Sequence, residues 1–170
     1  MKQLLPAVTI TLEMIEKAKT LIPQTQVNRT ITSKIDTLTG HLGEFVFAQW
    51  LYGDWTKNSV GNNKGKADFD NIEIKTSAFP FNENLNLLVR QDYAQKRKPT
   101  YYVQIIIDVP TRKATEILPN TVAYICGFAT AAMVDAAPLR DFGSKIAPSG
   151  GYLCHYIAIR NLQPMNKNNL

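Results

Sequence analysis

The sequence has little of what marks a disulfide-stabilised, zinc-binding or membrane protein. It contains two cysteines, Cys126 and Cys154, in 170 residues, and they do not form a CxxC pair. This count argues against a disulfide scaffold and favours a reducing compartment, so we expect a cytoplasmic protein. No stretch approaches 18 uninterrupted apolar residues, and the N-terminal segment breaks at Pro6 and turns charged at Glu13. Neither a membrane span nor a secretory signal is therefore expected.

Several catalytic signatures are also missing. No glycine-rich loop of the Walker type is present, and no order of serine, histidine and aspartate suggests a hydrolase triad. The two histidines, His41 and His155, lie far apart in the sequence. Lone histidines of this kind are more often core or surface residues than ligands, so the sequence does not indicate a histidine metal site.

The composition that remains is that of an ordinary globular domain with a basic balance. Apolar residues make up 45% of the chain and charged residues 19%, which suits one domain with a sizeable core. Nineteen basic against 14 acidic side chains give a formal charge of +5, which favours a polyanionic partner, although many basic proteins bind none. We expect a single domain over residues 1–170, ending in a short polar tail at 166–170.

The spacing of apolar residues predicts an α/β (α+β) fold. Helical periodicity indicates helices at 11–22, with Thr11 as a possible cap, and at 32–52. Gly40 and Gly43 lower the stability of the second helix unless another backbone comes close there. The run at 101–109 is apolar on both faces, as in a central strand covered on both sides. Further strands are expected at 72–79, 85–89, 115–119, 121–128 and 152–160, and short helices at 90–98 and 129–137.

Charged and apolar residues alternate in ADFDNIEIKT, residues 67–76. Asp70 and Asn71 both tolerate positive φ, so they can form a two-residue hairpin turn. Phe69 then pairs with Ile72, and both anchor the hairpin in the core.

Three charged side chains share the other face of this hairpin. Asp68 pairs with Glu73, and Lys75 follows on the same face because side chains alternate along a strand. Two carboxylates this close repel one another, and Mg²⁺ or Mn²⁺ offsets that repulsion better than Lys75 alone. The Ile74 carbonyl can complete the oxygen ligands. The alternative is a solvent-facing hairpin whose charges are polar filler.

Other charges accompany the hairpin. Glu44 lies between buried positions of the 32–52 helix, where its carboxylate either finds a partner or extends to water. Basic residues gather in the loop before the hairpin and around the segment 90–98, where they either follow a phosphate backbone or form a solvated face. These candidate nucleic-acid contacts are Lys57, Lys64, Lys66, Arg90, Lys96, Arg97 and Lys98.

Four motifs follow one another along the chain: GHLGE in a helix, the aspartate of ADFD, IEIKTS on the next strand, and the later strand YYVQIIID. Their order resembles the core of the PD-(D/E)xK nuclease superfamily. The resemblance implies the restriction-endonuclease-like fold, with an αβββαβ core over about residues 32–109. Its mixed central sheet is flanked by helices, and a mixed α/β remainder follows at 110–165. Ala67 replaces the proline that names the motif, and the two acids stand unusually close in the sequence.

The resemblance also implies roles for the candidate residues. Asp68 and Glu73 match the metal-binding acids, Lys75 the catalytic lysine and Glu44 the accessory helix glutamate. The implied activity is Mg²⁺- or Mn²⁺-dependent hydrolysis of phosphodiester bonds by a DNA endonuclease, with double-stranded DNA as substrate. Cutting both strands with one site per chain suggests a homodimer or higher homo-oligomer. The alternative is a non-catalytic nucleic-acid-binding or assembly module on the same fold.

Overall fold

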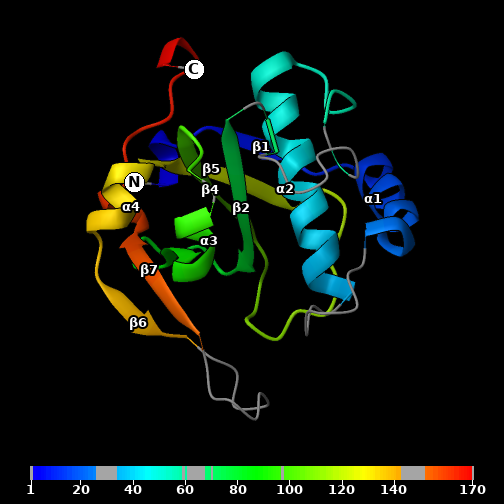
Figure 1. Ribbon diagram of the computed structural model, residues 1–170. Helices are drawn as coiled ribbons and strands as arrows, with labels where there is room; N and C mark the ends of the chain where they lie inside the picture. The colour runs from blue at the N-terminus through cyan, green and yellow to red at the C-terminus, as the bar shows by residue number, and fades with distance from the viewer. Residues whose placement is uncertain are drawn as a thin grey trace.

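The computed structural model describes residues 2–25, 34–58, 60, 68–69, 71–96, 98–142 and 152–169. The strands of the central sheet are β1 (Ala7–Thr9), β2 (Ile72–Phe79), β4 (Tyr101–Asp108) and β5 (Val122–Thr130). Within the described residues, their order is β1-β5-β4-β2 (Figure 1). β2 and β4 are parallel, whereas β4, β5 and β1 pair antiparallel, so the sheet is mixed as predicted. β4 is buried on both faces, which confirms it as a central strand.

The helices are α1 (Leu12–Thr25), α2 (Lys34–Tyr52), α3 (Gln91–Lys96) and α4 (Ala131–Ala136), with 3-10 turns η1 (Lys2–Leu4), η2 (Ile159–Asn161) and η3 (Lys167–Asn169). α2 packs against the central sheet, and α1 packs against α2. The apolar stripe that predicted α2 is buried, with Leu42, Phe45 and Val46 fully inaccessible. Thr11 Oγ1 accepts a hydrogen bond from the Met14 N–H at 3.2 Å, so the predicted cap of α1 is confirmed.

A second sheet covers the other face of the central sheet. It consists of β3 (Asn86–Arg90), β7 (Leu153–Ala158) and β6 (Leu139–Asp141), paired antiparallel in the order β3-β7-β6. Tyr102 and Ile106 of β4 share a hydrophobic cluster with Leu87 and Val89 of β3. Val103, from the opposite face of β4, belongs instead to the cluster formed with α1 and α2. The domain therefore has two cores, one on each side of the central sheet.

This second sheet differs from the expected αβββαβ core. The chain does run from α2 through β2, β3 and α3 to β4, but β3 pairs with β7 and not with a central strand. Spacing within a segment predicts that a strand forms, whereas its partner depends on residues far away in the sequence. The structure supports a mixed sheet flanked by helices.

A close contact between α2 and β2 depends on Gly43. A Cβ atom at this position would lie 1.8 Å from Thr76 Oγ1 and 2.7 Å from Thr76 Cβ. Only a residue without a side chain lets the helix approach the strand this closely. A Cβ at Gly40 would meet nothing within 4 Å, so a close neighbour is found at Gly43, where it is the Thr76 side chain, and not at Gly40.

Other expectations fail where strands are short or irregular. The predicted strand at 115–119 is wrong: Ile117 is buried between exposed neighbours, and Pro119 has no N–H to donate to a sheet. β1 and β6 were not predicted, since three residues are too few to show a periodicity. None of the described helices is long and apolar enough to cross a membrane.

Candidate functional site

The hairpin turn predicted at Asp70-Asn71 brings the first candidate residues into place. Phe69 and Ile72 form an isolated antiparallel bridge in which each backbone N–H donates to the carbonyl of the other, at 3.0 and 2.6 Å. Phe69 is buried, and its ring centroid lies 4.9 Å from that of Phe47 on α2. The predicted pairing of Phe69 with Ile72 is confirmed. Asp70, in the turn itself, lies outside the described residues.

Asp68 lies at the outer edge of β2. Its Oδ2 accepts a hydrogen bond from the backbone N–H of Ile74 at 2.8 Å. In a strand, the N–H and C=O of one residue point to the same side, and residues two apart share that side. Because Ile72 turns both groups toward Phe69, the Ile74 carbonyl also points to this edge. The Asp68 carboxylate and the Ile74 carbonyl are therefore neighbours, as two of the predicted metal ligands should be.

Glu73 and Lys75 project together from one face of β2. The Lys75 Nζ lies 3.6 Å from Glu73 Oε1, and the two side chains are 31% and 17% exposed respectively. In the register with β4, Glu73 lies beside Tyr102 and Lys75 beside Gln104, so this face is turned toward the second core. The prediction that Glu73 and Lys75 share a face is confirmed, whereas the predicted pairing of Asp68 with Glu73 stays a prediction. Both side chains are partly buried, so the alternative of a fully solvent-facing hairpin does not apply to them.

Glu44 comes from the other side of the sheet. Gly43 rests on Thr76, whose side chain points to the face opposite that of Lys75, so α2 covers that opposite face. One carboxylate oxygen of Glu44, Oε2, is buried. The alternative in which this group extends fully into water is therefore wrong. The structure thus places Asp68 at the outer edge of β2 and Glu44 on the helix that covers one face of the sheet.

Gln104 was not identified from the sequence. It is 1% exposed, and its Nε2 donates a hydrogen bond to the Ile105 carbonyl at 3.0 Å. The pairing of β4 with β5 shifts register between these two residues, opposite Gly127, whose φ of +138° suits only glycine. A buried amide is costly unless it is hydrogen-bonded, and this one lies beside Lys75 on the same face. The available signal was a single polar residue inside the apolar run YYVQIIID.

The basic residues proposed as nucleic-acid contacts have different surroundings. Lys98 forms an ion pair with Asp135 at 2.6 Å, so its charge is partly offset. Lys57 is exposed, with Nζ 5.9 Å from the ring centroid of Tyr52, and Lys96 is exposed at the end of α3. Lys64, Lys66 and Arg97 lie outside the described residues.

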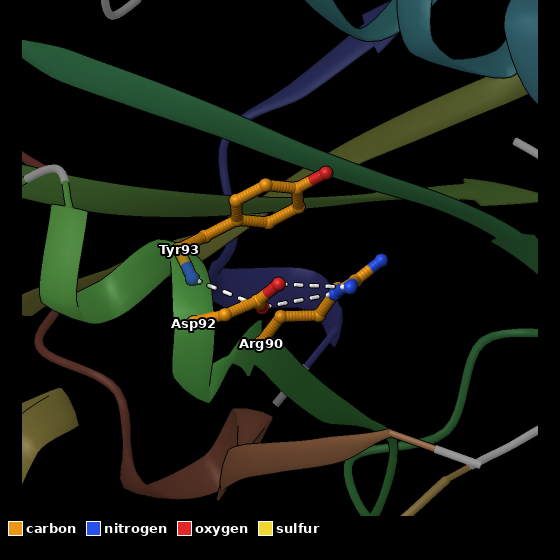
Figure 2. Close-up of polar contacts among 3 residues, drawn as sticks. All are labelled: Arg90, Asp92 and Tyr93. Atoms are coloured by element: carbon orange, nitrogen blue, oxygen red, sulfur yellow. Dashed lines mark hydrogen bonds and ion pairs between the residues drawn. The ribbon is translucent and has the colours of Figure 1, made fainter. Parts of the chain in front are cut away.

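Arg90 does not belong to the basic helix predicted at 90–98. It is the last residue of β3, and the helix that follows ends at Lys96. Figure 2 shows its guanidinium paired with the Asp92 carboxylate, with Nε 3.1 Å from Oδ1 and Nη2 2.9 Å from Oδ2. This hydrogen-bonded pair raises the pKa of Arg90 above its usual value and lowers the pKa of Asp92. Arg90 is therefore held in one orientation by its neighbour.

Both cysteines are free and buried. Burial raises the pKa of the Cys126 thiol to about 12. Burial also raises the pKa of Cys154; the positive charges of Arg90 and Lys75 lower it, and the negative charges of Asp92 and Asp141 raise it further.

The oxygen atoms around Asp68 and Glu73 define the candidate metal ligands. Among the residues that the structure describes, no group of three or more histidine, cysteine, aspartate or glutamate side chains could hold a metal ion. The ligand set predicted from the sequence contains two such side chains, Asp68 and Glu73, together with the Ile74 carbonyl. Mg²⁺ commonly takes one or two carboxylates and fills its other positions with water and substrate phosphate, so this hard-oxygen set fits it.

Comparison of the chain with protein-family models, with curated proteins and with solved structures finds no match. The function is therefore inferred from the site itself.

Proposed function

We propose that this protein is a metal-dependent nuclease that hydrolyses phosphodiester bonds of DNA, on a fold of the restriction-endonuclease-like type. The supporting observation is the Phe69–Ile72 bridge, which places Asp68 beside the Ile74 N–H while Glu73 and Lys75 form a pair two residues apart. Two acids and a lysine on adjoining sides of one strand are the groups that hydrolysis of a phosphodiester needs.

Asp68, Glu73 and the Ile74 carbonyl would hold Mg²⁺ or Mn²⁺. The hydrogen bond from the Ile74 N–H fixes the orientation of the Asp68 carboxylate, as residues that support metal ligands commonly do. A bound ion would polarise the scissile phosphate and make the attacking water more acidic. Glu44, from α2, would support this edge of the site as an accessory acid.

Lys75 supplies the positive charge at the reacting phosphate. The water oxygen forms a bond to phosphorus, the bond to one ester oxygen breaks, and the leaving oxygen takes a proton. Negative charge grows on the phosphate oxygens during this step, and the Lys75 ammonium stabilises it by hydrogen bonding. Glu73 on one side and Gln104 on the other restrict where the ammonium can lie.

The proposal extends to the setting of the protein. A cytoplasmic enzyme acting on double-stranded DNA fits the reduced cysteines and the net charge of +5. A homodimer or higher homo-oligomer would supply a second site for the second strand.

The test separates binding from chemistry. Lys75→Ala should abolish cleavage and leave DNA affinity nearly unchanged, because one lysine adds little to binding dominated by the phosphate backbone but acts where charge develops. Lys113→Ala, which removes an exposed lysine from the loop between β4 and β5, is the matched control and should cut normally. Equal cleavage by wild type and Lys75→Ala would refute the assignment of Lys75. A wild type that binds DNA but never cuts it with Mg²⁺ or Mn²⁺ would instead be a non-catalytic binding module.

A further inference from the structure

Two arginines lie in one row across the second sheet. Cys154 of β7 is paired in register with Arg90 of β3 on one side and with Arg140 of β6 on the other. Residues directly opposite on neighbouring strands share a face, and strands lie about 4.8 Å apart, so the two arginines start about 10 Å from each other on the same face. The opposite face of β3 carries Leu87 and Val89, which are buried in the second core.

Each of these arginines lies over two aromatic rings. The Arg90 Cζ is 4.7 Å from the ring centroid of Tyr93 and 4.8 Å from that of Tyr152. Figure 2 shows the first of these rings next to the Arg90–Asp92 pair. The Arg140 Cζ is 4.3 Å from the ring centroid of Phe142 and 5.0 Å from that of Tyr156. We call this surface the arginine–aromatic face; it consists of Arg90, Arg140, Tyr93, Tyr152, Phe142 and Tyr156.

The polar groups of this face remain suited to an anionic ligand. Asp92 engages Nε and Nη2 of Arg90, which leaves the Nη1 donors on the far side of the guanidinium. The ion pair lowers the net charge near Arg90, but it also holds the planar group against the rings. A guanidinium held in this way can donate to a phosphate in a defined direction.

The exposed rings indicate what accompanies the phosphate. Tyr93 and Tyr152 are 38% and 44% exposed, which is high for large aromatic side chains. Aromatic rings beside arginines are the combination that binds single-stranded nucleic acids, whose phosphates contact the cations while unpaired bases stack on the rings. In a duplex the base faces are already stacked, so the rings would gain little from it.

We propose that the arginine–aromatic face binds a single-stranded or locally unpaired segment of nucleic acid, with phosphates on Arg90 and Arg140 and bases on the exposed tyrosines. The inference goes beyond the proposed nuclease function, since it assigns a nucleic-acid contact outside the site formed by Asp68, Glu73 and Lys75. Arg90 and Arg140 lie on the face of the second sheet that is turned away from the second core, whereas Lys75 faces that core. A bound strand would run along this outer face of the second sheet, in addition to the basic segment around Lys96.

The experiment compares two double variants that remove the same charge. Arg90→Ala with Arg140→Ala, and the control Arg112→Ala with Lys113→Ala, each lower the formal net charge from +5 by two. Binding of a fluorescently labelled single-stranded DNA is measured by anisotropy in chelator, so that cleavage plays no part. The first pair should weaken binding by roughly tenfold or more at low salt and reduce the slope of log affinity against log salt by about 1.4, because each single-strand phosphate contact contributes about 0.7. The control pair should change the slope much less.

Tyr152→Ala tests base stacking separately from charge. It should weaken single-strand binding by roughly tenfold, as loss of one stacked base does, and should leave binding of a blunt duplex nearly unchanged. Equal effects of the two double variants would overturn the binding face, and equal effects of Tyr152→Ala on both ligands would overturn the preference for single strands. Melting temperatures confirm that each variant is folded. If the wild type binds single strands through this face but never cleaves DNA, only the proposed nuclease function is refuted. If the wild type cleaves DNA and Arg90→Ala/Arg140→Ala binds single strands as tightly as the wild type, only the proposed binding face is refuted.

Discussion

Replacing Gly43 by alanine should push α2 away from β2. The new Cβ would meet three atoms of Thr76 at 1.8, 2.7 and 2.8 Å. Rotation of the Thr76 side chain moves Oγ1 and Cγ2 but leaves its Cβ in place, so the backbone must shift. Overpacking of this kind costs about 1–3 kcal/mol, and the better helix propensity of alanine returns roughly 0.5–1 kcal/mol. We expect a net loss of about 1–2 kcal/mol of unfolding free energy, or a melting temperature lower by roughly 2–8 °C for a domain of this size.

Gly40→Ala is the matched control for this change. It lies one helical turn before Gly43 on the same helix, and its Cβ would meet nothing within 4 Å. The same substitution should therefore stabilise the protein by up to about 1 kcal/mol through helix propensity alone. Urea and thermal unfolding of the two variants measure the contrast, and adding Thr76→Ala to Gly43→Ala should restore part of the lost stability.

The displacement of α2 should also reach the candidate site, because Glu44 follows Gly43 directly. DNA cleavage by Gly43→Ala should therefore fall even under conditions in which the variant is fully folded, while Gly40→Ala cuts like wild type. If both glycine variants gain stability equally, the close approach of α2 to β2 does not exist, and the placement of Glu44 argued from it is wrong.

Two further changes probe a buried histidine of α2 and the buried amide beside Lys75. Burial lowers the pKa of His41, so the unfolded chain takes up a proton at higher pH than the folded protein does. The contribution of His41 to stability should therefore be full above about pH 6.5 and decrease as the pH falls toward the folded pKa, by at most about 1.4 kcal/mol per pH unit. Between pH 7.5 and 5.5, the urea midpoint of His41→Gln should therefore fall less than that of the wild type. Identical pH dependence of the two proteins would contradict this role of His41. Gln104→Met keeps the volume of a buried side chain but removes the amide beside Lys75, so kcat for DNA cleavage should fall roughly tenfold with little change in KM, the scale of one lost hydrogen bond. An unchanged kcat in a folded Gln104→Met variant would show that the amide serves the core alone.

The parts of the fold that follow from short-range rules were predictable from the sequence. Asp70-Asn71 between alternating residues predicted the Phe69–Ile72 pairing, and Thr11 before an amphipathic run predicted a helix cap. The apolar run at 101–109 predicted a strand covered on both faces. Each of these features depends on neighbours within a few residues.

Features that depend on the register of distant strands were not predictable. Nothing near Arg90 in the sequence indicates that Arg90 and Arg140 lie on either side of Cys154 in the second sheet. Nor does the sequence indicate that the Tyr152 ring lies against Arg90. The position of Gln104 beside Lys75 likewise follows from the parallel pairing of β2 with β4. Part of the candidate site, and the whole arginine–aromatic face, thus needed the tertiary structure.

The central claim is that Asp68, Glu73 and Lys75 form a metal-dependent hydrolytic site. The most direct test is cleavage of a supercoiled plasmid by the purified protein in Mg²⁺, in Mn²⁺, in Ca²⁺ and in excess chelator, with Asp68→Asn as the inactive comparison. Mg²⁺ and Mn²⁺ should support cleavage, Ca²⁺ should allow binding with little turnover because its looser coordination orients water poorly, and chelator should stop the reaction. Robust cleavage in excess chelator, or equal cleavage by wild type and Asp68→Asn, would contradict the account.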